Sequence, residues 1–596
     1  MKNDENSVNL SRRDFFKELG MIGGGGVLLS AFPWLQSCSA DDKVQIAKEK
    51  VRIGFIGTGS RGQYHLNNLK TIPYADVVAL CDNYPPHLKE ASALYPKAKT
   101  YDDYRKLLDD RDIQAVMIAT PLYEHAHITI DALHAGKHVF CEKSMAMTCA
   151  QRAKYVFYFI GDGMGVNQVN GTEMYLAEQE GRIGVKPLLF TTFPAGTVAT
   201  TFSATNSVTD SSAAGTALAT GAKTYNGAIG MDDDKNALQT VAEKAKKAGR
   251  KVGVTTSVSV DHATPAAFYA HQPNRSMYYE IALDLPKAGF DFYAGGGFLK
   301  PATTADKKDA PSIFPIIEEA GYTIARGLDE YKTKAADAGK MVLIQKEGAV
   351  PSCLPYAIDR KEGDLTLPEI TESAISFLTK GNNKGFFLMV EGGKIDWACH
   401  GNDPATVFEE VIDLDNAVKV AYEFYKKHPK ETLIVVTADH ETGGMSLGTG
   451  RYELRLKALT NQEQSQDLLS KAITDLRKDS DKASWEEVKA LLADKMGFWE
   501  ELPLTWEQEK MLRDEYETSF VKNKVVFEES LYAKTEPLAA AARKVMSQIA
   551  MVGWTGSGHT AGYVPVFAIG AGSDLFVGKM DNTEIPKRIA KAAGYK

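Results

Sequence analysis

Apolar, strand-like runs in residues 154–596 end repeatedly in side chains that bind divalent metals. These side chains are Asp162 after YVFYFIG, Glu391 after GFFLMV, Asp439 and His440 after ETLIVVTA, and, in further turns, Asp396, His400 and His559. In open parallel sheets, ligands bind beyond the carboxyl ends of the strands. Residues that follow several parallel strands are therefore expected to converge on one place.

A cluster of this composition favours bound cations. Buried carboxylates repel one another and are costly to desolvate, and a divalent cation removes that conflict. Imidazole with carboxylate suits zinc, whereas oxygen ligands alone suit magnesium. Two zinc sites about 4 Å apart would form a clamp for displacement at phosphorus. Taken singly, Asp162 could cap a helix, Glu391 could be a solvated acid and His440 could be a core histidine, but five segments with the same pattern favour a metal site.

The segment VTDSSAAGTALATG (208–221) supplies a candidate nucleophile. Ser211 follows Asp210 at the expected start of a helix, where backbone N–H groups and the helix dipole favour an anion. Beside a metal, such a hydroxyl could ionise near neutral pH. An N-cap is the alternative interpretation, and the pattern alone does not choose between Ser211 and Ser212.

Six segments together resemble the alkaline phosphatase family, in order and over nearly all of residues 154–596. They are IGDGMG, TDSSAAGTALATGAKTYNGAIG, DHATPAAFYAH, VEGGKIDWACH, TADHETGG and SGHTAG. The resemblance implies an α/β fold with a central, mostly parallel sheet, flanking helices and a helical insertion at about 450–550. It also implies hydrolysis of phosphate monoesters through a phosphoserine at Ser211.

The same resemblance assigns two zinc ions, one magnesium ion and a phosphate clamp. The first zinc would be held by Asp396, His400 and His559, and the second by Asp162, Asp439 and His440. Magnesium would be held by Asp162, Thr264 and Glu391. Arg275, in AHQPNR, would hold two phosphate oxygens with its planar fork.

Two positions vary within the family that the chain resembles. His262 stands where some members have Asp; it is expected to contact magnesium through water and to loosen magnesium binding. Trp397 stands where others have Lys or His. The loss of a cation there should weaken phosphate binding and could speed product release.

The segment between His440 and His559 contains amphipathic helical patterns such as NQEQSQDLLSKAITDLRK. The family resemblance implies that this insertion forms a cap or the interface of a homodimer. A solvated helical cover without a specific role is the alternative.

Residues 51–150, which precede the segments discussed so far, show the pattern of a different fold. VRIGFIGTGSRG (51–62) reads as a strand and a GxGxxG loop, and the next strand ends in Asp82, a spacing typical of dinucleotide-binding folds. Residues 51–150 resemble the Rossmann half of the Gfo/Idh/MocA oxidoreductases, in the exported branch that contains NAD-dependent glycosidases. The family's Glu-Lys-Pro turn reads Glu142-Lys143-Ser144 here, and no substrate domain follows. We therefore expect a truncated fold in which bound NAD, if any, has no function.

The chain begins with a predicted export signal. SRRDFFK (11–17) and the apolar stretch after it resemble a twin-arginine export signal over residues 1–37. LQSC (35–38) resembles a lipoprotein box, so a lipidated Cys38 would tether the protein to a membrane, with 38–50 as a linker. This predicts a periplasmic or cell-envelope location; an ordinary flexible leader is the alternative.

Composition excludes other classes. The net charge of −8 and the lack of a basic block argue against nucleic-acid recognition, and six cysteines without CxxC spacing argue against a disulfide scaffold. Three alternatives to a phosphomonoesterase stay open: a phosphodiesterase on the same metal scaffold, an NAD-dependent oxidoreductase or glycosidase, and a binding protein that uses the nucleotide fold as a tether.

Overall fold

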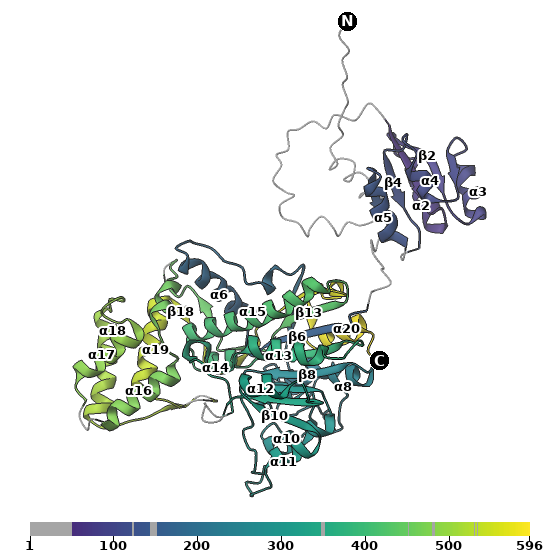
Figure 1. Cartoon of the computed structure of the whole chain (residues 1–596). Helices are drawn as coiled ribbons and strands as arrows, with labels where there is room; N and C mark the ends of the chain where they lie inside the picture. The colour runs from purple at the N-terminus through teal and green to yellow at the C-terminus, as the bar shows by residue number, and fades with distance from the viewer. Residues whose placement is uncertain are drawn as a thin grey trace. The chain divides into compact units, whose positions relative to one another are not determined.

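The computed structural model describes residues 50–121, 124–142, 152–346, 352–450, 452–479, 483–529, 531–532 and 534–596 (Figure 1). The chain divides into two compact units, Met1–Ala150 and Gln151–Lys596, and each is treated by itself. The predicted export signal, Cys38 and nearly all of the linker lie outside the described residues, as do Lys143 and Ser144. Within the described residues, no helix has the length and apolar character needed to cross a membrane.

The smaller unit is built on one parallel sheet with the strand order β3-β2-β1-β4-β5. Its strands are β1 (Val51–Ile56), β2 (Ala75–Cys81), β3 (Lys99–Tyr101), β4 (Ala115–Ile118) and β5 (His138–Cys141). Its helices are α2 (Ser60–Leu69), α3 (Pro85–Leu94), α4 (Tyr104–Leu108) and α5 (His125–His134). Phe55 and Ile56 belong to different apolar clusters, which shows that both faces of the sheet are covered. The predicted Rossmann-like alternation is confirmed.

The larger unit contains a ten-stranded sheet with the order β10-β11-β9-β8-β12-β6-β13-β20-β7-β21. The sheet is mostly parallel, and β20 runs antiparallel to both of its neighbours. Its strands are β6 (Tyr155–Gly161), β7 (Ala195–Thr200), β8 (Lys251–Thr256), β9 (Phe292–Gly295), β10 (Tyr322–Arg326), β11 (Lys340–Ile344), β12 (Phe386–Gly392), β13 (Thr432–Thr437), β20 (Val564–Gly570) and β21 (Met580–Asp581). The predicted α/β class is confirmed.

Helices cover both faces of this sheet. One layer contains α6 (Val166–Gln179), α13 (Leu367–Thr379) and α15 (Pro404–Lys427). The other contains α7 (Ser211–Thr220), α8 (Val241–Lys247), α9 (Ala263–Ala266) and α20 (Glu584–Ala593). Every residue of β6, β12 and β13 is buried. This double cover explains why these strands read as continuous apolar runs without polar alternation.

Shorter elements complete the larger unit. Among the described residues, the remaining α-helices outside the insertion are α10 (Tyr278–Ala288), α11 (Ile313–Glu319), α12 (Leu328–Lys334) and α14 (Lys394–His400). Two small antiparallel pairs join β14 (Glu441–Thr442) to β19 (His559–Thr560) and β15 (Ser446–Leu447) to β18 (Val552–Gly553). The first pair brings the chain that follows His440 beside His559.

The predicted insertion is helical. It contains α16 (Gln466–Asp479), α17 (Trp485–Met496), α18 (Trp506–Tyr516) and α19 (Pro537–Ala550), and the other three helices all contact α19. Figure 1 shows the four grouped at one end of the larger unit. Between α18 and α19, the short strands β16 (Glu528–Glu529) and β17 (Lys534–Thr535) pair antiparallel.

Asp403 joins this insertion to the sheet domain. It caps α15 by accepting hydrogen bonds from the backbone and the hydroxyl of Thr406, at 3.3 and 2.7 Å. It also accepts from Gln462 Nε2 at 2.9 Å and from the backbone N–H of Gln466 at 3.0 Å. Its side chain is almost completely buried, so no water can replace these bonds.

Asp403→Ala should lower the free energy of unfolding of the larger unit by about 2–4 kcal/mol, because it removes a cap and leaves buried donors unpaired. Tryptophan fluorescence during urea denaturation measures this unit, since every tryptophan except Trp34 lies in it. Asp494→Ala, on the exposed side of α17 with a single ion pair to Lys495, is the matched control. Equal effects of the two substitutions would contradict this role of Asp403.

Candidate metal centre

Three candidate carboxylates lie at the carboxyl ends of the central strands. Asp162 directly follows β6, Glu391 is the penultimate residue of β12, and Asp439 lies two residues after β13. Because β12 and β13 both pair in parallel with β6, the three side chains meet at one edge of the sheet. All three are fully buried.

The ligand atoms form three contiguous groups, within each of which all atoms lie within 4.8 Å of one another. The groups are Asp396, His440 and His559; Asp162, Asp439 and His440; and Asp162, His262 and Glu391. His400 adjoins the first group, with Nε2 at 3.2 Å from both Asp396 Oδ2 and His559 Nε2. Thr264 Oγ1 reaches Asp162 Oδ2 at 3.4 Å and Asp439 Oδ2 at 3.3 Å.

Two of the histidines are oriented by backbone carbonyls. His400 Nδ1 lies 2.5 Å from the Ser557 carbonyl oxygen, and His559 Nδ1 lies 2.8 Å from that of Thr209. A carbonyl oxygen only accepts, so Nδ1 must carry the proton and donate. The lone pair of Nε2 then faces the cluster, which is the arrangement of a metal-ligating histidine.

Gly163 makes room between the groups. Its φ of 70° lies in the left-handed region, and a Cβ at this position would lie 2.9 Å from both Asp396 Oδ1 and Thr442 Oγ1. Its backbone N–H donates to Asp439 Oδ1 at 3.2 Å. A side chain at residue 163 would therefore displace Asp396 and Thr442.

Several buried polar atoms in the cluster have no hydrogen-bond partner among the described residues. They are Asp162 Oδ1, Glu391 Oε1, Asp396 Oδ2 and both ring nitrogens of His262. Buried oxygen and nitrogen atoms are normally paired. Unpaired atoms of the two kinds that bind cations, in one cluster, fit a group of divalent metal ions.

The pKa values of these carboxyl groups show that ionising them together costs free energy, which bound cations would offset. Burial, reinforced by the neighbouring carboxylates, raises the pKa of Asp162 well above its usual range, that of Glu391 to about 8 and that of Asp439 to about 7. Burial also opposes ionisation of Asp396, but His400 and His559 outweigh it and lower its pKa. Burial depresses the pKa of His440 well below its usual range, so its ring is neutral and able to bind a metal.

The two serines at the start of α7 have different surroundings. Ser211 Oγ is fully buried and lies 3.1 Å from His440 Nε2, inside the cluster. Ser212 Oγ instead donates to Asp210 Oδ2 at 2.5 Å, while Asp210 caps α7 through the Ala213 backbone N–H. Only Ser211 of this pair therefore faces the candidate metal ligands, and it does so at a helix N-terminus, where the dipole favours an anion.

Arg275 is held at the rim of the cluster by two partners. Nη1 lies 3.4 Å from Asp210 Oδ2, and Nη2 donates to the hydroxyl of Tyr532 at 2.8 Å. Its backbone N–H donates to the Gly227 carbonyl at 2.8 Å. The guanidinium is thus fixed beside the residue that precedes Ser211.

Sequence reasoning missed three residues of this site. The hydroxyl of Thr256 donates to Glu391, and that of Thr442 donates to Asp396 Oδ1 at 2.5 Å. Thr442 lies within the quoted segment TADHETGG, but nothing in its spacing marks it as a partner of Asp396. Tyr532 belongs to the helical insertion, far along the chain from every motif, and no sequence signal points to it.

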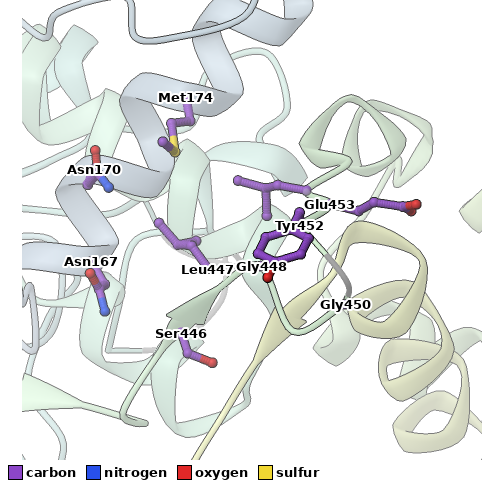
Figure 2. Close-up of a pocket in the computed structure, with 10 residues that line it drawn as sticks. Asn167, Asn170, Met174, Ser446, Leu447, Gly448, Gly450, Tyr452 and Glu453 are labelled. Atoms are coloured by element: carbon purple, nitrogen blue, oxygen red, sulfur yellow. The ribbon is translucent and has the colours of Figure 1, made fainter.

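A separate hollow of about 980 Å³ lies between α6 and the chain from Ser446 to Leu454 (Figure 2). Its lining includes Asn167, Asn170 and Met174 of α6, facing Leu447 and the strongly exposed Tyr452. None of the candidate metal ligands lines it, so it is distinct from the metal centre.

In the smaller unit, the structure brings the glycine loop and Asp82 together. The backbone N–H and the hydroxyl of Thr58 donate to Asp82 Oδ2 at 2.7 and 3.0 Å. The backbone N–H of Tyr84 donates to the other oxygen at 2.9 Å. Gly57 has φ 90°, and a Cβ there would lie 2.6 Å from the backbone of Ala119. The carboxylate thus stabilises the loop that a dinucleotide would approach.

Comparison with known proteins agrees with this geometry. Residues 153–291 and 349–595 match the family model of alkaline phosphatase. Alkaline phosphatase 3 of Bacillus subtilis (strain 168) is 34% identical over 452 residues, or 74% of this chain and 89% of that protein. The crystal structure of a cold-active alkaline phosphatase from a psychrophilic Shewanella sp. aligns with a TM-score of 0.62 at 30% identity, covering 74% of this chain and 99% of the other. The alkaline phosphatase of the Antarctic bacterium TAB5 aligns with a TM-score of 0.52 at 28% identity, covering 75% and 99%.

Residues 51–158 match a different family model, that of an oxidoreductase family with an NAD-binding Rossmann fold. This match covers the smaller unit and ends at residue 158, inside the first strand of the larger one, whereas the phosphatase match covers most of the chain. Together with the buried cluster of metal-binding side chains, these findings show that the chain belongs to the alkaline phosphatase family and is a metal-dependent phosphomonoesterase.

Proposed function

We propose that this phosphomonoesterase acts through Ser211, which becomes phosphorylated; water then hydrolyses the phosphoserine, which regenerates the serine hydroxyl and releases inorganic phosphate. The observation that carries the proposal is the position of Ser211 Oγ, buried at the N-terminus of α7 and 3.1 Å from His440 Nε2. This oxygen lies beside a proposed metal ligand and faces the positive end of a helix dipole. The dipole, together with cations held by the neighbouring ligands, would favour the ionised form, which is the nucleophile.

Two zinc ions and one magnesium ion are the cations we propose for the cluster. Asp396, His400 and His559 would hold the first zinc; Asp162, Asp439 and His440 the second; and Asp162, Thr264 and Glu391 the magnesium. Bound cations supply Lewis acidity, which lowers the pKa of the nucleophile and offsets phosphate charge.

The third group, Asp162, His262 and Glu391, fits magnesium through its two carboxylates, whereas His262 adds a nitrogen ligand. A solved relative, a mutant of TAB5 alkaline phosphatase, holds Mg in a site named M3. In this chain, His262 contributes a ring nitrogen to the group with Asp162 and Glu391. Burial, with Arg275 next in importance, lowers its pKa to about 3, so the ring is neutral. A neutral imidazole beside two carboxylates also suits zinc, which agrees with the expectation of loose magnesium binding.

The protein's own groups position the phosphate for this step. The Arg275 guanidinium, held between Asp210 and Tyr532, has a planar fork that fits two phosphate oxygens. In-line displacement forms the bond from Ser211 Oγ to phosphorus and breaks the bond from phosphorus to the ester oxygen, which takes up a proton and leaves as the alcohol. Ser212 stays outside the reaction because its hydroxyl is bonded to Asp210.

Ser211→Ala should reduce the hydrolysis of an aryl phosphate monoester by at least about 10³-fold while leaving metal content unchanged. Ser212→Ala is the matched control and should retain most of the activity. Steady-state rates on an aryl monoester and an aryl diester, with metal content from elemental analysis, make the measurement. Undiminished activity of the Ser211→Ala protein would contradict the mechanism, and faster turnover of the diester would favour a phosphodiesterase.

Removal of the metals should make stability depend on pH with a defined sign. Asp162, Glu391 and Asp439 have raised pKa values in the folded state, whereas the unfolded chain has lost these protons above about pH 5. His400, whose net pKa is also raised although burial opposes it, acts in the same direction. Stability is therefore lost as pH rises through these folded values.

The EDTA-treated protein should lose about 2 kcal/mol of stability between about pH 6.5 and pH 8. Below that window, the buried neutral His262 and His440 act in the opposite direction. Urea denaturation at several pH values measures the effect, and added zinc and magnesium should remove it, because cations replace the protons. A metal-free protein that is equally stable at the two pH values would refute this account of the cluster.

We propose that the smaller unit takes no part in phosphate hydrolysis. Its glycine loop and Asp82 retain the outline of a dinucleotide site, but the catalytic candidates all lie in Gln151–Lys596. An NAD-dependent reaction would also need a substrate site, and the sequence after residue 150 does not resemble the substrate domain of the oxidoreductase family.

Residues 152–596 produced alone should therefore keep the kcat and KM of the full chain toward an aryl phosphate, within about twofold. Calorimetric titration of NAD into the full chain, with the shortened protein as control, measures separately whether the glycine loop binds NAD. A large loss of phosphatase activity on shortening would show that the smaller unit contributes to the reaction.

The location and assembly of the protein are proposed from features of its sequence. We propose export by the twin-arginine segment to the periplasm or cell envelope, a membrane tether through lipidated Cys38, and a homodimer. The substrate is a small phosphate monoester, with no nucleic-acid readout.

A further inference from the structure

One side chain of the helical insertion reaches the metal centre. Tyr532 lies between the short strands β16 and β17, and its ring stacks on that of Trp397 with the centroids 4.9 Å apart and the planes at 17°. The ring also meets His400 edge-on at 5.3 Å and His262 at 5.4 Å. It therefore touches the proposed first and third metal groups at once.

The hydroxyl of Tyr532 contacts the proposed phosphate clamp. It accepts a hydrogen bond from Arg275 Nη2 at 2.8 Å, while Asp210 Oδ2 lies 3.4 Å from Nη1 on the other side. An arginine side chain loses substantial conformational entropy when it binds a ligand in one orientation. Partners that hold the guanidinium beforehand reduce that cost, and here one partner comes from the sheet domain and one from the insertion.

The hairpin that carries Tyr532 is itself fixed to the site. Glu528, in β16, pairs with Arg543 of α19 at 3.2 Å and with Lys544 at 3.3 Å. The buried Arg543 also donates to the carbonyl of Gly401, the residue after His400. The insertion thus contacts α14 at two points: Arg543 binds the carbonyl just after its last residue, and Tyr532 stacks on Trp397 within it.

We propose that Tyr532 is a positioning residue for phosphate, which acts by holding the Arg275 guanidinium in its binding orientation. This rests on the proposed role of Arg275 in the phosphatase reaction. Because the contact acts on the phosphate clamp, its loss weakens binding of inorganic phosphate and of every monoester by a similar factor. A residue that served only to receive an aromatic leaving group would affect aryl esters alone.

Tyr532→Phe in the full, metal-loaded protein keeps the ring and removes the hydroxyl. It should raise the KM for both an aryl and an alkyl phosphate, and the inhibition constant of inorganic phosphate, by about three- to tenfold, with kcat unchanged or higher. Metal content should stay the same. Tyr452→Phe, at an exposed tyrosine without a side-chain hydrogen bond among the described contacts, is the matched control.

A double-mutant cycle separates positioning through Arg275 from any other role. In an Arg275→Ala background, Tyr532→Phe should have no further effect on phosphate inhibition. Glu528→Gln, which weakens the anchor of the hairpin, should raise the same constant by a smaller factor. An unchanged or lower phosphate inhibition constant in Tyr532→Phe, an effect confined to aryl esters, or full additivity with Arg275→Ala would each overturn the proposal.

Calorimetric titration of inorganic phosphate into metal-loaded Ser211→Ala protein, with and without Tyr532→Phe, gives a reading that needs no turnover. Weaker phosphate binding in the double variant supports the inference, and equal binding overturns it. Activity that survived in Ser211→Ala would instead refute the proposed nucleophile, whatever the result at Tyr532.

Discussion

Repulsion between buried carboxylates is the constraint that the rest of this structure depends on. Asp162, Glu391 and Asp439 are placed together because β6 pairs in parallel with both β12 and β13. Each is fully buried, and burial raises its pKa. The folded chain must therefore hold either protons or cations at this edge of the sheet. The same cluster therefore governs both stability and activity, since the cations that relieve the repulsion are also those that a phosphomonoesterase needs.

The surrounding shell makes the cluster specific for cations. Backbone carbonyls fix the Nδ1 protons of His400 and His559, so the Nε2 lone pairs point inward. Gly163 leaves the space that a Cβ would fill, and Asp210 binds the hydroxyl of Ser212, so that only Ser211 lies against the cluster. These contacts come from the protein's own groups, so the fold itself holds the cluster in place, which is the condition for electrostatic stabilisation at low reorganisation cost.

The helical insertion is bonded to the site more closely than a solvated cover would be. Asp403 ties Gln462 and Gln466 to the start of α15, and Arg543 binds the end of α14. Through these connections the insertion places Tyr532 against Arg275, the candidate phosphate clamp. The smaller unit, taken by itself, has its own glycine loop, carboxylate and two apolar clusters.

The sequence by itself determined the fold class and which strand ends carry metal-binding side chains. This was possible because parallel strands deliver their carboxyl ends to one edge, so local patterns imply a shared location. Six quoted segments also sufficed to identify the family. The choice between Ser211 and Ser212 needed the tertiary structure, since both lie at the same helix start and differ only in their contacts. Tyr532 needed it most, because its position depends on how a short hairpin packs against α14 and α19. Contacts between segments far apart in the chain leave no periodicity or spacing in the sequence, and only the folded chain decides them.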